Sequence, residues 1–293
     1  RRLYRFSSLS SDVPRAAGVA LAGALLLSAS AQAATISFLP HQASYDLSLL
    51  KSRNGAAAVD SARGRILYTF TGSACEGYTS EFRQVSELNG SEGKSTLSDL
   101  RSTSWEDAEG KTYRFRIDTR MNEGNASNVD GIAERTGDHV TVTLKQPVAK
   151  TFTLDGSTVF PTEQIRRIIA AAREGKSLLE LTVYDGSDNG EKVYNTLTVI
   201  GKPIPGDKVA TPDPSTSNDA MKKLTRWPVT VSYYDRDAKS NSGEQTPTYA
   251  MSFELYENGV SRALKLDYND FVIAGKLDKF EVKSTKPCKP GEK

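Results

Sequence analysis

Apolar and polar residues alternate with a period of two along most of this 293-residue chain, and glycine, asparagine or aspartate interrupts the alternation at short intervals. In one such run, Tyr45, Leu47 and Leu49 occupy every second position. This pattern is typical of a strand that has one face in a core and the other in solvent. Short turns, for example residues 257–259 and 185–190, favour antiparallel hairpins.

Runs of this kind recur from residue 44 to residue 273, and we count about fourteen of them. They lie at residues 44–49, 66–70, 78–88, 96–105, 113–117, 129–135, 140–144, 150–154, 179–183, 193–199, 229–233, 251–255, 264–268 and 271–273. The sequence therefore predicts an all-β fold of antiparallel strands.

One helix is expected among the strands. Its apolar residues recur at i, i+3, i+4 and i+7, namely Ile165, Ile168, Ile169 and Ala172. Thr162 with Glu163 can cap its start, and Gly175 ends it. A lone amphipathic helix in a long antiparallel sheet closes an open end or packs on a concave face.

A second interruption of the strand pattern is the long loop at about residues 205–219, rich in Pro, Asp, Ser and Thr, which we expect to be mobile.

Residues 1–33 have the features of an export signal. Arginines at positions 1, 2 and 5 precede an apolar stretch, and Ala31-Gln32-Ala33 has the small-x-small form that signal peptidase accepts. We expect cleavage after Ala33, which leaves residues 34–293 as a single domain in the periplasm. An uncleaved membrane anchor is the alternative.

Only two cysteines occur, Cys75 and Cys288. In an oxidising compartment they are expected to form a disulfide with each other; two unrelated free thiols are the alternative. Neither belongs to a C-x-x-C motif, so nothing supports a redox role.

Charge and hydropathy restrict the partners. Loss of residues 1–33 removes four arginines and one aspartate, which changes the net charge from +2 to −1. A nearly neutral chain argues against a nucleic-acid partner. After the signal no apolar run is long enough to span a bilayer, and the polar strand faces argue against an outer-membrane barrel.

Motifs for catalysis, metals or cofactors are missing. With only His41 and His139 present, a metal site built on histidine and cysteine is not expected. The sequence contains no G-x-S-x-G, H-E-x-x-H or phosphate-binding glycine loop, so we predict neither catalytic residues nor a cofactor. Residues 185–190 resemble the opening of a calcium loop, but Thr196 replaces the bidentate glutamate, so a hairpin turn is favoured.

The candidate ligand-binding residues belong to one predicted strand. Arg114, Arg116 and Arg120 share a face that could form a cationic wall for an anionic ligand, although a solvated outer face balanced by acidic residues is the simpler interpretation. Tyr113 and Phe115 lie on the opposite face, where an open sheet could leave aromatic side chains accessible to a ligand.

Several short segments together resemble the EipB family of periplasmic cell-envelope integrity proteins of Gram-negative bacteria. These segments are residues 40–47 (PHQASYDL), 75–78 (CEGY), 160–164 (FPTEQ), 184–187 (YDGS), 192–194 (KVY) and 227–229 (WPV). The resemblance implies a bent, spiral-like open barrel of about fourteen strands with one helix, held by a disulfide between Cys75 and Cys288. It also implies a non-enzymatic role in envelope integrity.

Three classes of function remain open. In the first, the protein binds other envelope proteins through sheet edges or an aromatic patch. In the second, it carries or chaperones a lipid or lipoprotein in the concave face of the sheet, as half-open barrels do. An unrecognised hydrolase is the third.

Overall fold

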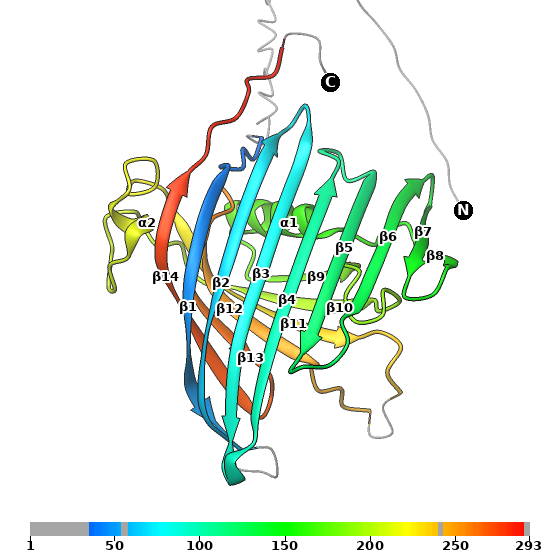
Figure 1. Ribbon diagram of the computed structural model, residues 1–293. Coiled ribbons are helices and arrows are strands. Elements are labelled where there is room, and N and C mark those ends of the chain that lie inside the picture. Colours follow the sequence, from blue (N-terminus) through cyan, green and yellow to red (C-terminus); the bar gives the residue numbers. More distant parts are fainter. Residues whose placement is uncertain (1–34, 54–57, 240–242, 290–293) are drawn as a thin grey trace, which may run out of the picture. The chain divides into compact units, whose positions relative to one another are not determined.

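Fourteen strands of the described chain pair side by side in one antiparallel sheet (Figure 1). The computed structural model describes residues 35–53, 58–239 and 243–289. The strands are β1 (His41–Ser52), β2 (Val59–Ser73), β3 (Gly77–Gly90), β4 (Ser95–Glu106), β5 (Thr112–Met121), β6 (Ser127–Thr136), β7 (His139–Gln146), β8 (Lys150–Asp155), β9 (Leu178–Val183), β10 (Tyr194–Ile200), β11 (Arg226–Asp235), β12 (Tyr249–Tyr256), β13 (Ser261–Asp267) and β14 (Phe271–Val282). A short 3-10 turn, η1 (Ser91–Gly93), separates β3 from β4.

The sheet consists of two meanders that meet at β1 and β14. From β1 to β8, and again from β9 to β14, each strand pairs with the next one in the sequence. β1 then pairs with β14, with Tyr45 opposite Leu277, so the two meanders form one continuous sheet. β8 and β9 are the two edges, and the sheet is not closed. The predicted all-β fold of fourteen antiparallel strands is confirmed.

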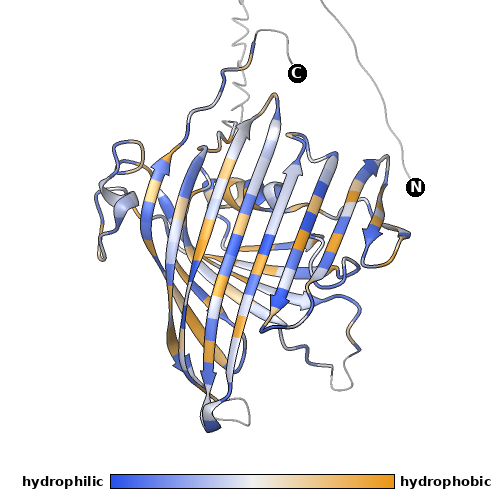
Figure 2. Cartoon of the chain, viewed as in Figure 1, coloured by the Kyte–Doolittle hydropathy of each residue, from blue (hydrophilic) through white to orange (hydrophobic). Residues whose placement is uncertain are grey.

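The sheet curves into an open, spiral-like barrel. Strands β9–β13 lie behind β1–β5, and the two walls enclose the interior (Figure 1). Register shifts in the β1–β14 pair, after Ser44 and after Leu49, increase the local twist that bends the sheet. Polar and apolar bands alternate along the strands (Figure 2). On β2, Ile66 and Phe70 are buried on the inner face whereas Arg65 is exposed on the outer one.

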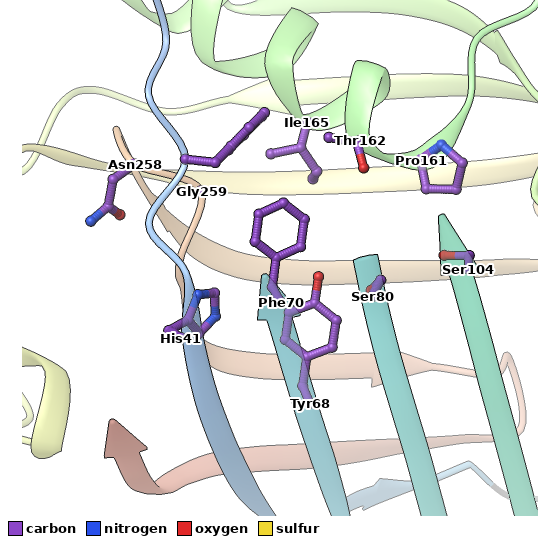
Figure 3. Close-up of a pocket in the computed structure, with 11 residues that line it drawn as sticks. His41, Tyr68, Phe70, Ser80, Ser104, Pro161, Thr162, Ile165, Asn258 and Gly259 are labelled. Carbon is purple, nitrogen blue, oxygen red and sulfur yellow. The ribbon is translucent and has the colours of Figure 1, made fainter. Parts of the chain in front are cut away.

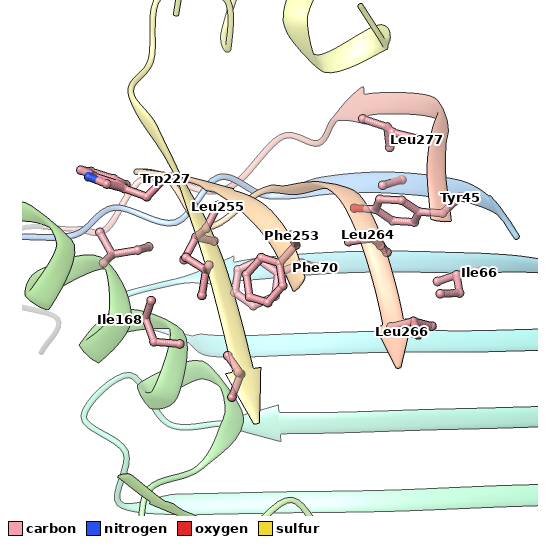
Figure 4. Close-up of a cluster of buried hydrophobic side chains, with 14 of the residues drawn as sticks. Tyr45, Ile66, Phe70, Ile168, Trp227, Phe253, Leu255, Leu264, Leu266 and Leu277 are labelled. Atoms are coloured by element: carbon pink, nitrogen blue, oxygen red, sulfur yellow. The ribbon is translucent and has the colours of Figure 1, made fainter. Parts of the chain in front are cut away.

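Helix α1 (Pro161–Arg173) packs its apolar stripe against the inner face of the sheet. Ile168 and Ile169 are fully buried, and Ile168 lies close to Leu255 and Trp227 (Figure 4). The helix ends as predicted, with Gly175 in the left-handed region at φ 73°. The predicted stripe is confirmed.

The predicted cap of α1 is wrong. The helix begins at Pro161, and its N-cap residue, Phe160, has no side-chain hydrogen bond to the helix. The backbone N–H groups of Thr162 and Glu163 instead donate to the carboxylate of Glu106, at 2.7 and 2.9 Å. Glu106 ends β4, and a cap supplied from a distant strand leaves no local sequence signal.

Two groups of buried side chains fill different parts of the concave face. The first surrounds α1 and joins β1 and β2 to strands β10–β14. The second lies over β5–β8 and includes Phe160, Tyr184 and Val193 from the connecting segments. A third, smaller cluster of Met221, Tyr256 and Val260 is separate from both.

The segment 205–219 contains a one-turn helix, α2 (Pro214–Ser217), capped by the side chain of Asp213. Asp213 also pairs with Arg262 of β13, with an Nε–Oδ2 distance of 2.6 Å, and both side chains are almost fully buried. Arg262 donates a further hydrogen bond to the Thr211 carbonyl. These contacts hold the second half of the loop on the sheet; its mobility stays a prediction.

The two cysteines lie together, as predicted. Cys75, in the turn between β2 and β3, is bonded to Cys288 beyond β14, with the Cα atoms 5.8 Å apart. The described residues from Ile36 onward form one compact unit. The predicted signal peptide, residues 1–33, lies outside the described residues. Within the described ranges, no helix combines the length and the hydropathy needed to cross a membrane.

Candidate functional site

The interior of the open barrel contains an apolar chamber of about 410 Å³. Strands β1–β4 form one wall, β12 and β13 form the other, and Ile165 of α1 lies at one end. The residues that line it are Tyr45, Ile66, Tyr68, Phe82, Gln84, Leu100, Ile165, Tyr249, Met251, Phe253, Gly259, Ser261, Leu264, Leu266 and Tyr268. Because aliphatic and aromatic side chains make up most of this lining, the chamber suits an apolar ligand.

The end of the chamber away from α1 is its more exposed end. Tyr268, just beyond the end of β13, retains 37% of its accessible surface, whereas Leu264 and Leu266 of β13 retain 8% and 6%. The rings of Tyr268 and Tyr249 are stacked, with centroids 6.5 Å apart, and Tyr233 continues the stack at 4.5 Å from Tyr249. The chamber therefore opens beside a row of tyrosines.

A smaller pocket of about 110 Å³ adjoins the chamber at the α1 end. Tyr68, Ile165 and Gly259 line both spaces, so the two lie next to each other. In Figure 3, Tyr68 and Ser80 project from their strands toward Thr162 at the start of α1. Unlike the chamber, this pocket carries several polar side chains, which are His41, Ser80, Ser104, Thr162 and Asn258.

Glu106 fixes the start of α1 beside this pocket. The side chain is buried, at 2% exposure for the residue, and burial raises its pKa to about 7. The hydrogen bonds from the backbone of Thr162 and Glu163 act in the opposite direction, because they favour the ionised carboxylate. The carboxylate also interacts favourably with the positive end of the helix.

The structure places the five predicted ligand-binding residues on opposite faces of β5. Arg114, Arg116 and Arg120 are exposed on the outer face, whereas Tyr113 and Phe115 are buried at 3% exposure in the core over β5–β8. The side chains of the arginines and of the two aromatic residues therefore point to opposite sides of the sheet. Ligand binding by either group stays a prediction.

Acidic residues accompany the arginines on the outer face. Arg116 lies 3.5 Å from Asp118, and Arg83 and Arg101 both pair with Asp99. The hydrogen bond from Arg83 is the largest cause of the lowered pKa of Asp99. Arg114 stacks on Trp105, with its guanidinium carbon 5.5 Å from the ring centroid. The surface is one of mixed charge.

The segment 185–190 connects β9 to β10, as the hairpin interpretation predicted. The partly buried side chain of Asp185 accepts a hydrogen bond from the backbone N–H of Ser187. Thr196, at the position of a calcium loop's glutamate, donates to the carbonyl of Leu181 within the sheet. Among the described residues, no group of three or more His, Cys, Asp or Glu side chains is placed to hold a metal ion.

The two histidines lie in different environments. His41 is buried at the start of β1, with Nδ1 2.7 Å from the Leu39 carbonyl oxygen, and burial lowers its pKa. His139 is at the start of β7, with its Nδ1 3.3 Å from a carboxylate oxygen of Asp138. His41 belongs to the polar pocket, a position that sequence reasoning did not assign to it.

Sequence reasoning also missed the chamber itself. Met251, Leu264 and Leu266 lie in predicted strands, but their shared space arises because β12 and β13 face β1–β4 across the barrel. These strands are far apart in the sequence, so no local pattern shows that a space is left between them.

Comparison with known proteins supports one family. The EipB-like family profile matches residues 32–284. The cell envelope integrity protein EipB of Brucella abortus (strain 2308) is 35% identical over 266 residues, which cover 90% of this chain and 91% of that protein. A solved structure from Brucella abortus, described as a beta-barrel-like protein of domain of unknown function DUF1849, has a TM-score of 0.76 and 32% identity, and the match covers 85% of this chain and 100% of that one.

Proposed function

Because the chain belongs to the EipB-like family, we propose that it maintains the integrity of the cell envelope from the periplasm. Its molecular activity is the binding of an apolar chain, such as the acyl chain of an envelope lipid or lipoprotein. This activity is non-covalent and needs no cofactor. The name of the Brucella relative supports the role, and the described interior of the barrel supports the activity.

The single observation that carries the proposal is the unfilled apolar chamber. Twelve of its fifteen lining residues are aromatic, aliphatic or methionine, and they leave about 410 Å³ between the walls. An acyl chain that enters such a space gains about 0.8 kcal/mol for each methylene group removed from water. Natural proteins keep accessible apolar concavities mainly where a ligand binds.

Strand addition at a sheet edge is the second candidate. β8 pairs only with β7 in the sheet, and the edge strand β9 exposes Leu178 at 59%. An extended segment of an envelope protein could pair with β8, or with the part of β9 that precedes the bridge between Val159 and Val183. Both edge strands are short, at six residues each. β8 begins with Lys150 and ends with Asp155, and short strands with charged residues are typical of edges protected against pairing. We therefore place the chamber first.

Two substitutions on β4 test the proposal. Leu100 lines the chamber, whereas Leu97 lies on the outer face and is 50% exposed. Leu100→Asp places a carboxylate beside the bound chain, so we expect at least a tenfold loss of affinity for a lauroyl ligand. In a strain that lacks its own copy, this variant should fail to restore resistance to detergent at normal abundance.

Leu97→Asp is the matched control and should bind the ligand and complement the strain. Native mass spectrometry of the protein purified from the periplasm gives a direct readout, because a copurifying lipid should be lost only from Leu100→Asp. If Leu100→Asp complements as well as Leu97→Asp does, the chamber is not the functional site.

A further inference from the structure

The polar pocket at the α1 end determines which head group the chamber can accept. It shares Tyr68, Ile165 and Gly259 with the lining of the chamber, so the head group of a chain that reaches the α1 end of the chamber lies beside this pocket. The pocket measures about 110 Å³ and is lined by hydroxyl, amide and imidazole groups beside aromatic rings. Not one of these described lining residues is a lysine, arginine, aspartate or glutamate.

His41 provides a defined hydrogen-bond acceptor in the pocket. Nδ1 lies 2.7 Å from the Leu39 carbonyl oxygen, and since a carbonyl only accepts, Nδ1 carries the proton. Burial favours the neutral ring, which leaves a lone pair on Nε2. Within the described ranges, the ring's hydrogen bond is the one from Nδ1 to Leu39. A ligand group that donates a hydrogen bond therefore fits this position.

The pocket disfavours a charged head group. The N-terminus of a helix is a common anion site, but here the Glu106 carboxylate already accepts from the N–H groups of Thr162 and Glu163. Arg166, one turn further along α1, is engaged with Glu163 and lies over the ring of Phe38. A carboxylate or phosphate in the pocket would be desolvated without a cationic partner among the lining residues and, above about pH 7, would also face the charge of Glu106.

We infer that the chamber and the polar pocket together bind an amphiphile whose acyl chain fills the chamber and whose uncharged, hydrogen-bond-donating head group contacts His41. This inference rests on the proposed function and adds the chemistry of the head group. An acylglycerol and an N-acylated peptide end share that chemistry, since each has an uncharged acyl linkage beside a hydroxyl or N–H donor. A free fatty acid and a phospholipid phosphate are excluded as preferred ligands.

The test compares five ligands with a twelve-carbon chain by titration calorimetry on the wild-type protein at about pH 8, where laurate is ionised. Monolauroylglycerol and N-lauroylserinamide are uncharged and donate hydrogen bonds. Methyl laurate is uncharged but donates none, and laurate and lauryltrimethylammonium are charged. We expect the better donor ligand to bind at least tenfold more tightly than either charged ligand, and about fivefold more tightly than methyl laurate, since one net hydrogen bond is at stake.

Variants of His41 identify the acceptor. His41→Phe keeps a planar ring but removes the acceptor, so it should abolish the preference over methyl laurate while methyl laurate still binds. His41→Gln retains an acceptor and should restore at least part of the preference. The double variant Ser80→Ala/Ser104→Ala leaves the ring intact and should weaken the donor ligands only. Unchanged binding of methyl laurate shows in each case that the chamber is still folded.

Each outcome separates the inference from the proposed function. If no lauroyl ligand binds to the wild-type protein, the proposed function fails. If laurate or lauryltrimethylammonium binds as tightly as the donor ligands, or if His41→Phe keeps the wild-type preference, the inference about the head group fails and the chamber proposal stands. The tighter of the two donor ligands distinguishes an acylglycerol source from an acylated protein source.

Discussion

The concave face of the sheet has two regions that differ in what covers them. Over β5–β8, side chains from the segment between β9 and β10 fill the space and form a closed core. Between β1–β4 and β12–β13, no segment of the described chain enters, and a chamber of about 410 Å³ remains. The strands of both regions show the same alternation of apolar and polar residues, so the difference comes from a connecting loop.

Two glycines allow this loop to approach the sheet closely. A Cβ atom on Gly186 would lie 2.5 Å from the ring of Phe115, and one on Gly190 would lie 2.9 Å from Val129. The hydroxyl of Tyr113 donates to the carbonyl of Asp185 and so ties the loop to β5. The turn between β12 and β13 also has a close-packed glycine, Gly259 beside Phe38, but it stays at the rim of the chamber.

Helix α1 marks the border between the two regions. Phe160, the residue before it, belongs to the filled core, whereas Ile165 already lines the chamber. Glu106 holds this end of the helix on β4. Tyr113 and Phe115 therefore serve as core on one side of the border, while Tyr68 and Phe253 remain available to a ligand on the other.

Truncation of one phenylalanine in each region should give the largest difference in the free energy of unfolding between the two regions. Phe115→Ala removes a ring that packs against Tyr113 and Tyr184, with centroids 5.1 and 5.7 Å away, and should lower the free energy of unfolding by about 3–5 kcal/mol. Phe82→Ala enlarges a space that already exists, so the expected loss is roughly 1–2 kcal/mol. Urea denaturation measures both, and equal losses would show that the chamber region is packed as tightly as the filled one.

Substitution at Gly186 should destabilise the filled region, because it disturbs the loop that packs against β5. Gly186→Ala adds a Cβ against the ring of Phe115 at a residue with φ 73°, and we expect a loss of about 2–4 kcal/mol. Gly175 has the same φ with no atom within 4 Å of an added Cβ, so Gly175→Ala should cost only about 1 kcal/mol. Comparing the thermal unfolding of the two variants separates the effect of the crowded Cβ from that of the positive φ. If they lose the same stability, the loop does not depend on close packing.

Alternation was sufficient to predict the strands but not the two regions. Each of the fourteen predicted runs overlaps one observed strand, and only Val193 and Tyr268 fall one residue outside, because side chains on a strand alternate between its faces. The pairing of β1 with β14 joins the two ends of the sequence, and only the family resemblance implied the open barrel. Alternation also could not show that Tyr113 is part of the filled core whereas Tyr68 lines the chamber. The loop around Asp185, some seventy residues away in sequence, covers Tyr113 but does not cover Tyr68.

The site was predictable only in outline. The sequence indicated that an open concave face could bind a lipid, but it did not indicate the chamber's lining or the role of His41. Glu106 was missed because its partners, Thr162 and Glu163, are 56 and 57 residues away, and a buried glutamate at the end of a strand resembles any exposed one in the sequence. Such residues act through contacts between distant segments, which a local pattern does not encode.

The smallest expected effect is a change in the pH dependence of stability at the border between the regions. Burial raises the pKa of Glu106 from 4.5 to about 7, so the folded protein keeps this proton at pH values where the unfolded chain has released it. The stability that Glu106 contributes is therefore fully present below about pH 4.5 and decreases as the pH rises to about 7.

Glu106→Gln should remove this dependence, because the amide stays neutral throughout the range. We expect the stability of the wild type relative to Glu106→Gln to fall by about 1–3 kcal/mol between pH 4.5 and 7. Urea denaturation at a series of pH values measures the difference, and subtracting the variant cancels the carboxylates that both proteins share. A difference that stays flat, or that grows with pH, would mean that Glu106 is ionised throughout and that its bonds to Thr162 and Glu163 outweigh its burial. In that case α1 would be held at the border by a permanent charge, and the polar pocket beside it would reject anionic head groups even in mildly acidic solution.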